Sequence, residues 1–264
     1  FSEVLFRPNG LLGGFGAPGD PLIAWSRAPY GTDGRWTFAW NGAAFDISMQ
    51  DDAQGVAFTL ATKPTKRLVF QGPNGFSRKG DGPTAASLYY SFTRLTTEGT
   101  LTIGEDTIGV AGESWMDKEF GSNQLADDQV GWDWFSLRLH DGRDLMLYLL
   151  RSDTGTVYGR GTIVSPDGST QFLDGSAWTL TTTERWRSDR TEAEYPIRWE
   201  LRVPELDLDA SIAPLLEAQE NVTVLVPGLF YWEGAVEVLS RAGNRIGEGY
   251  VELTGYGTRS RPAI

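Results

Sequence analysis

The sequence predicts an all-β protein, and three observations lead to this expectation. The 264 residues include 32 glycines, many of them between short apolar segments, where turns are expected. Val, Thr, Tyr, Phe and Trp, which favour strands, are abundant, and few segments show helical periodicity. Even spacing of short strands by turn residues favours barrels or sandwiches over a βαβ arrangement.

The first 60 residues are expected to form a meander of short strands. These strands are placed at 1–6, 23–26, 35–40, 44–49 and 56–61. Turns at 32–34 and 41–42 contain Asn, Asp and Gly, which tolerate the positive φ of tight hairpins. The next segment, 63–87, is the most basic part of the chain, and we interpret it as a looped, solvated surface in preference to a ligand clamp. Strands are expected again at 88–95 and 99–103, with Gly99 in the turn between them.

Acidic and aromatic side chains are concentrated in the run GESWMDKEFG, residues 112–121. In an extended backbone, side chains alternate between the two faces of a strand. One face would then carry Glu113, Trp115, Asp117 and Glu119. A carboxyl beside an indole is a candidate acid, because desolvation and neighbouring negative charges both raise its pKa. Asp117 is therefore the preferred catalytic candidate; the alternative is a surface carboxylate paired with Lys118 or Arg138.

A polar link at 122–131 is the expected domain boundary, which divides the chain into domains at 1–121 and 122–264. A long hairpin follows, with its turn at Asp141-Gly142. In its first strand Asp133 falls in phase with three apolar residues, so that an acid shares an apolar face. The remaining strands are expected at 157–165, 170–174, 177–186, 197–203, 230–240 and 247–257. One short helix is expected at 212–220.

A second group of polar and aromatic residues lies on other expected strands. Its members are Tyr89, Tyr90, Tyr231, Trp232, Glu233, Tyr250, Glu252 and Tyr256. Along the last strand, alternation places Tyr250, Glu252 and Tyr256 on one face. The group fits a cavity lined by ring faces and hydrogen-bonding groups. It equally fits strands with polar outer faces and cross-strand aromatic pairs.

Composition excludes several classes of function. The formal net charge of -12 opposes binding to nucleic acid or to an anionic membrane surface. The chain has no cysteine and a single histidine, His140, so disulfides, thiolate chemistry and multi-histidine metal sites are excluded. A carboxylate site at Asp127, Asp128 and Asp133 matches no calcium loop, and we expect no metal. No apolar run is long enough to span a bilayer, while the compartment, cytoplasm or periplasm, stays open.

Several blocks together resemble the AttH-like / carotenoid 1,2-hydratase (hydroxyneurosporene synthase) family. They are SLYYSFTRL, GESWMDKEFG, GWDWFSLRLHDGRDLMLYLLR, the Tyr195-Pro196 and Trp199 stretch, YWEGAV and GYVELTGY. The resemblance implies two lipocalin-like (calycin) β-barrel domains in tandem, with an apolar cavity near their junction. It also implies a further N-terminal portion in family members, so we expect a first barrel that is incomplete, with another chain or segment completing it.

The resemblance further implies a catalytic role for Trp115 and Asp117, which match a Y-x-D pattern of the carotenoid hydratases with Trp in place of Tyr. We therefore expect a cofactor-independent hydratase or isomerase that protonates a double bond of a lipophilic, isoprenoid-like substrate. Asp117, Trp115 and Glu119 are the expected catalytic residues. The expected substrate-binding residues are Tyr89, Tyr90, Glu113, Trp132, Asp133, Trp134, Trp232, Glu233, Glu252 and Tyr256. The alternatives are a non-catalytic lipid carrier and pericyclase-like cyclisation of a polyene.

Overall fold

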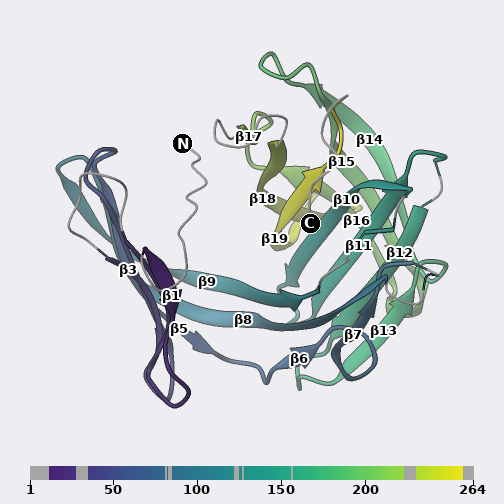
Figure 1. Cartoon of the computed structure of the whole chain (residues 1–264). Coiled ribbons are helices and arrows are strands. Elements are labelled where there is room, and N and C mark those ends of the chain that lie inside the picture. The colour runs from purple at the N-terminus through teal and green to yellow at the C-terminus, as the bar shows by residue number, and fades with distance from the viewer. Residues whose placement is uncertain are drawn as a thin grey trace. The chain divides into compact units, whose positions relative to one another are not determined.

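The computed structural model describes residues 12–27, 35–80, 82, 85–121, 125–126, 128–155, 157–222 and 230–257. These residues form nineteen strands and two short 3-10 turns, at Pro73–Gly75 and Pro204–Leu206, and they contain no α-helix. The prediction of an all-β protein is confirmed (Figure 1). The expected strand at 1–6 and turn at 32–34 lie outside the described residues. None of the described segments is a helix long and apolar enough to cross a membrane.

The first sheet has nine strands in the order β1-β2-β3-β4-β5-β8-β6, and β7 and β9 also pair with β8. Its strands are β1 (Gly13–Phe15), β2 (Leu22–Arg27), β3 (Arg35–Trp40), β4 (Phe45–Asp51), β5 (Val56–Pro64), β6 (Val69–Phe70), β7 (Phe76–Arg78), β8 (Ala86–Ile103) and β9 (Asp106–Phe120). The turn expected at 41–42 is present, and Gly42 has the positive φ of 97° that such a turn favours.

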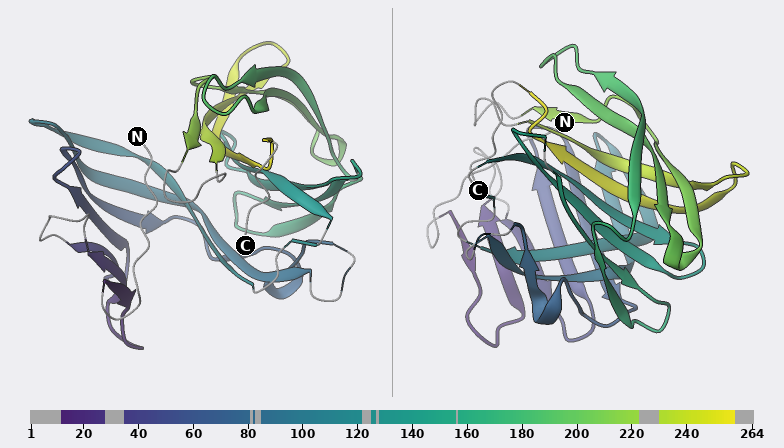
Figure 2. Two further views of the ribbon diagram at one scale, coloured as in Figure 1. Left: turned by 45° about the horizontal axis from the view of Figure 1, so that its top comes forward. Right: turned by 90° about the vertical axis from the view of Figure 1, so that its right-hand side faces the viewer.

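The second sheet has ten strands in the order β13-β12-β11-β10-β19-β18-β16-β15-β14, with β17 paired to β18. Its strands are β10 (Gln129–Leu139), β11 (Asp144–Ser152), β12 (Val157–Val164), β13 (Thr170–Asp174), β14 (Thr179–Arg187), β15 (Glu194–Val203), β16 (Leu208–Pro214), β17 (Glu220–Val222), β18 (Phe230–Ser240) and β19 (Arg245–Thr254). Figures 1 and 2 show this sheet curled around its own inner face, as a lipocalin-like architecture requires.

The chain divides into two compact units. One contains Leu68–Thr93 and Asp117–Ile264, and the other contains Val4–Arg67 and Arg94–Met116. The long strands β8 and β9 therefore each supply residues to both units. The boundary expected near residue 121 stays a prediction. Everything described below as a site lies within the first of these units.

The inner face of the ten-stranded sheet holds a large apolar core. Phe135 meets Trp199 edge-on at a ring distance of 5.2 Å, and Trp199 lies 6.4 Å from Trp232. Alternate residues of β10 point into this core, and Asp133 is among them with 5% exposure. The prediction that an acid shares the apolar face of this strand is confirmed.

The turn expected at Gly99 is absent, because β8 continues unbroken from Ala86 to Ile103. Gly99 lies opposite Leu60 of β5. A Cβ atom added at Gly99 would lie 2.0 Å from the carbonyl oxygen of Thr59. Glycine is needed here for close approach of two strands, not for a reversal of the chain.

The helix expected at 212–220 is also wrong. Ile212 belongs to β16, where it pairs with Trp199 on one side and Val238 on the other. The chain then leaves the sheet and returns as β17, which pairs with β18. Pairing with two neighbouring strands and burial of Ile212 in the core outweigh the local helical pattern.

Candidate functional site

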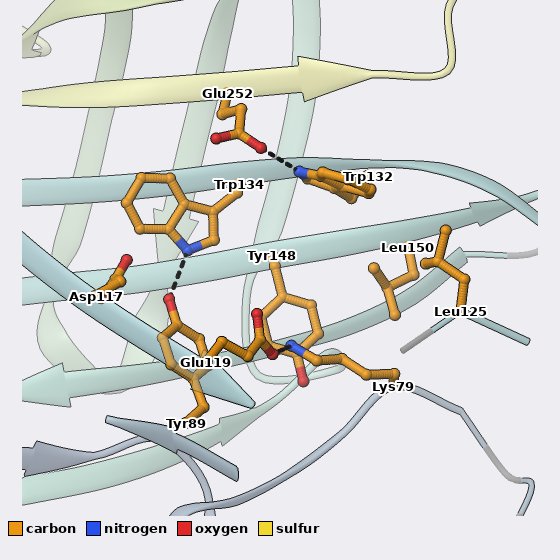
Figure 3. A pocket seen from close by; sticks show the side chains of 10 residues that line it. All are labelled: Lys79, Tyr89, Asp117, Glu119, Leu125, Trp132, Trp134, Tyr148, Leu150 and Glu252. Carbon is orange, nitrogen blue, oxygen red and sulfur yellow. Dashed lines mark hydrogen bonds and ion pairs between the residues drawn. The ribbon is translucent and has the colours of Figure 1, made fainter. Parts of the chain in front are cut away.

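A pocket of about 230 Å³ lies on the outer face of the ten-stranded sheet, opposite the core (Figure 3). Strands β8, β9, β10, β11 and β19 and the segments at 79 and 125 supply its walls. The lining residues are Lys79, Tyr89, Asp117, Glu119, Leu125, Trp132, Trp134, Tyr148, Leu150 and Glu252. The pocket thus combines four aromatic rings, three carboxyl groups and one ammonium group.

Strand pairing brings the sheet residues of the pocket together. Trp134 of β10 lies directly opposite Tyr148 of β11 and, on its other side, opposite Glu252 of β19. Trp132 lies opposite Leu150 in the same way. Residues that are directly opposed point to the same face of a sheet. Because Phe135 and its in-phase neighbours fill the core, these side chains face away from it.

Asp117 and Glu119 enter the pocket from β9. The expectation that this segment is extended is confirmed, since β9 runs from Asp106 to Phe120. The Ser91 hydroxyl donates a hydrogen bond to Asp117. Ser91 in turn accepts a hydrogen bond from the Gln71 amide at 2.9 Å, so that a buried chain of contacts orients the Asp117 carboxyl.

Tyr89 of β8 lies beside these carboxyl groups. The indole nitrogen of Trp134 donates a hydrogen bond of 3.1 Å to its hydroxyl oxygen, as Figure 3 shows. Burial raises the pKa of Tyr89 well above its usual value, and the charges of Asp117 and Glu119 raise it further. The side chain is therefore a neutral phenol that can donate its own proton in a hydrogen bond.

Lys79 supplies the positive charge of the pocket. Its ammonium group lies 2.6 Å from Glu119, which also accepts a hydrogen bond from Ser87. The same ammonium lies 5.1 Å from the centre of the Tyr89 ring and 4.5 Å from that of Tyr148. Lys79 is only 6% exposed, and the segment contains the strands β6 and β7. The interpretation of segment 63–87 as a looped, solvated surface is therefore wrong; at Lys79, ion pairing and ring contacts compensate the burial of the charge.

The surroundings of Glu252 alter the acidity of its carboxyl group. The Trp132 indole nitrogen donates to it at 2.7 Å, as drawn in Figure 3. Burial raises the pKa of Glu252 to about 7, and the charges of Glu233, Asp117 and Glu119 act in the same direction against the opposing effect of the Trp132 hydrogen bond. A carboxyl of this kind is partly protonated at neutral pH.

Asp133 and Tyr256 lie on the other face of the sheet. Asp133 accepts hydrogen bonds from Arg151 at 3.0 Å and from the Tyr256 hydroxyl at 2.9 Å. Tyr256 was expected to share a face with Glu252, but it packs against the core instead. The regular alternation ends because β19 stops at Thr254 and Gly255 takes a φ of 76°.

Other expected site residues do not line the pocket. Glu113 and Trp115 belong to the second unit, where Glu113 pairs with Arg94 at 3.2 Å. Tyr90 points away from Tyr89 on β8, and its ring lies 6.2 Å from that of Phe120. Trp232 is buried in the core, and Glu233 accepts a hydrogen bond from Asn221. Their functional roles stay predictions.

Four lining residues were not expected at a site: Lys79, Leu125, Tyr148 and Leu150. A signal for two of them exists in the run LMLYLLR, residues 145–151, because a nearly continuous apolar strand is buried on both faces. Lys79 and Leu125 adjoin turns and carry no comparable pattern. In the described part of the chain, no group of three or more His, Cys, Asp or Glu side chains is arranged to hold a metal ion.

Comparison with known proteins identifies crystal structures with the same fold. A crystal structure of an AttH protein from Nitrosomonas europaea is 33% identical, covers 84% of this chain and 68% of that chain, and superposes with a TM-score of 0.77. Kievitone hydratase from Nectria haematococca has the same fold, with 20% identity, a TM-score of 0.64, and coverage of 80% of this chain and 64% of that chain.

A curated relative, the dehydratase asqC of Emericella nidulans, is 22% identical over 184 residues. The match covers 66% of this chain and 51% of the relative, so the chain spans about half the length of that protein. The family model described as AttH-like matches residues 8–256, nearly the whole sequence. Together with the similarity to the Nitrosomonas protein, this match shows that the chain belongs to the AttH-like family.

Proposed function

We propose that this chain is a lyase that adds water to, or removes water from, a carbon–carbon double bond of a largely apolar small molecule held in the pocket. The observation that carries the proposal is that Glu252, whose pKa is raised by burial to about 7, and Asp117 line the same pocket, which is walled by aromatic rings. The names of two relatives, a hydratase and a dehydratase, support the same class of reaction.

Glu252 is the proposed general acid. A carboxyl with a pKa near the working pH is available in both protonation states and transfers protons efficiently in either direction. In hydration, Glu252 gives its proton to one alkene carbon, and the other carbon becomes a carbocation. The sequence alone favoured Asp117 for this role, but burial, which raises the pKa of Glu252 to about 7, favours Glu252.

Asp117 is the proposed general base. It accepts a hydrogen bond from Ser91 and lies next to the neutral Tyr89 phenol, and these contacts orient its carboxyl group in the pocket. As water forms the new C–O bond to the cation, Asp117 takes the proton that the water loses. Glu252 then recovers a proton from solvent and Asp117 releases one, so the overall change is the addition of one water molecule. Dehydration follows the same path in reverse.

The remaining walls suit such an intermediate. The faces of Trp132, Trp134 and Tyr89 offer negative electrostatic potential to a transient cation. The positive charge of Lys79 is compensated by Glu119 at 2.6 Å. An isoprenoid is a fitting substrate class, since its trisubstituted double bonds give tertiary cations on protonation.

Labelled water tests the proposal directly. Purified protein is incubated in H₂¹⁸O with the isoprenoid alcohols geraniol and farnesol and with ligand extracted from the protein, and products are analysed by mass spectrometry. We expect a product that gains one labelled water molecule, and its loss in Asp117→Asn and Glu252→Gln. Compounds that bind but are returned unlabelled would instead identify a carrier, and an unlabelled isomer would identify a cyclase.

A further inference from the structure

A second pocket lies on the same face of the ten-stranded sheet, next to the first. It has a volume of about 340 Å³, and its walls include Phe76, Met146, Phe172 and Leu173. Tyr148 lines both pockets. Phe76 and Phe172 are each 43% exposed, although their rings are apolar. Exposed rings at the wall of a pocket provide a surface for an apolar ligand group.

Strand register shows how the two pockets are related. Tyr148 lies opposite Trp134 of the first pocket on one side and opposite Arg160 of β12 on the other. Arg160 in turn lies opposite Asp174 of β13, and both line the second pocket. The residues form one row across neighbouring strands, and Tyr148 is the member of the row that stands between the pockets.

The Tyr148 ring is held firmly in this position. Its hydroxyl donates a hydrogen bond of 2.5 Å to the carbonyl oxygen of Arg78, and it lies 3.4 Å from the Ser77 hydroxyl. The ring also contacts the Lys79 ammonium, and the side chain is 4% exposed. A fixed, buried ring of this size is a wall and not a mobile surface group.

The first pocket is small, so the position of the Tyr148 ring limits what can bind there. Sites for drug-sized ligands typically measure about 300–1,000 Å³, and the pocket beside Glu252 and Asp117 is smaller, at about 230 Å³. It therefore accepts a short apolar group. Access to the second pocket would bring the combined site into the usual range.

We propose that Tyr148 is a specificity-determining residue whose ring closes the reaction pocket toward β12 and limits the length of the apolar group that reaches Glu252 and Asp117. Removal of the ring joins the two pockets, and the added space takes further apolar units of a longer substrate against Phe76 and Phe172. That the first pocket is the reaction site rests on the proposed function. The limit on length rests on the pocket walls themselves.

Binding measurements separate the length limit from catalysis. Geraniol, farnesol and geranylgeraniol, with two, three and four isoprene units, are titrated by calorimetry into protein carrying Glu252→Gln, which keeps the probes intact. In this background we expect affinity to stay level or fall as the alcohol lengthens. With Tyr148→Ala or Tyr148→Leu added, farnesol should bind at least about 10-fold tighter than geraniol, because each additional buried methylene makes the free energy of binding more favourable. Tyr148→Phe retains the wall and should keep the original preference.

Two exposed rings supply the matched controls. Adding Phe76→Ala and Phe172→Ala to Tyr148→Ala should remove most of the gain for farnesol and leave geraniol unchanged, whereas Phe15→Ala, at another exposed phenylalanine, should change neither. Equal length preference in Tyr148→Ala, Tyr148→Leu and Tyr148→Phe, with all three folded by circular dichroism, would overturn the assignment of Tyr148. Failure of every alcohol to bind any variant would overturn it too, while the labelled-water experiment judges the reaction separately.

Discussion

The two faces of the ten-stranded sheet each bury a carboxyl group, and the comparison shows how partners decide what such a group does. Asp133 and Glu252 lie on the adjacent strands β10 and β19, where Asp133 is opposite Leu253. Burial raises the pKa of both. On the inner face, Asp133 meets the Arg151 guanidinium and the Tyr256 hydroxyl. On the outer face, Glu252 meets the Trp132 indole, and no cation of the described residues pairs with it.

This difference gives the two carboxyls separate roles. A buried charge with a cation and a hydrogen-bond donor is satisfied, and it holds neighbouring strands in place. A buried carboxyl without a cation is close to neutral at physiological pH and can exchange its proton with a ligand. We therefore expect the inner carboxyl to stabilise the fold and the outer one to take part in catalysis.

The largest expected effect is on turnover. Glu252→Gln keeps the shape of the side chain and its contact with Trp132 but removes the transferable proton. We expect kcat/KM for hydration to fall about 10²–10⁴-fold, the usual contribution of a general acid or base. Initial rates measured with labelled water check this. Glu248→Gln, on the same strand outside the pocket, is the matched control, and equal rates in the two variants would remove Glu252 from the mechanism.

The next effect is on folding. Asp133→Ala leaves the partly buried Arg151 guanidinium without its charged partner and the Tyr256 hydroxyl without its acceptor. Loss of one member of a buried pair typically costs about 3–5 kcal/mol. The free energy of unfolding, measured with urea, should fall by an amount near the lower end of that range, because Arg151 is itself partly exposed. The double variant Asp133→Ala/Arg151→Met should lose less, since it leaves no unpaired charge. A greater loss in the double variant would contradict the role given to the inner carboxyl.

Replacing the outer carboxyl should stabilise the folded protein near neutral pH, whereas replacing the inner one destabilises it. The pKa of Glu252 rises from 4.5 to about 7 on folding, so between these values the folded state binds more protons than the unfolded state. Stability therefore falls as pH rises through this window. At 1.36 kcal/mol per unit, the penalty approaches about 3 kcal/mol above pH 7. Urea titrations should show that the stability of Glu252→Gln relative to wild type increases from pH 5 to 7. If the free energies of unfolding of the two proteins change in parallel with pH, the pKa of Glu252 is not raised in the folded state.

Much of the fold on both faces could be predicted from local chemistry. The turns at Asn41-Gly42 and Asp141-Gly142 occur where residues favouring positive φ were recognised, and the phase of Asp133 with Phe135 was visible in the sequence. The two errors, at Gly99 and at 212–220, arose where a distant strand decides the local structure. The sequence of neither segment indicates which distant strand it pairs with.

The site was harder to predict for the same reason. Alternation along β9 correctly placed Asp117 and Glu119 together, but which residues face them depends on pairing between strands far apart in sequence. Trp134 and Tyr89 meet across 45 residues, and Trp132 and Glu252 across 120. Lys79 lies beside a short strand in a basic segment, and its burial follows from contacts with Glu119 and with the rings of Tyr89 and Tyr148, which belong to three other strands.

The smallest expected effect sharpens the comparison on the outer face alone. Glu233 lies directly opposite Glu252 across β18 and β19, and after burial its charge is the next influence that raises the pKa of Glu252. Glu233→Gln retains an acceptor for Asn221 but removes this charge. The fall of the hydration rate with rising pH should therefore move to lower pH by less than one unit, because burial is unchanged. Glu237→Gln, which faces Glu248 in the next such pair, should leave the pH–rate profile in place; a shift of the same size there would mean that net charge, not the opposed carboxylate, sets the acidity of Glu252.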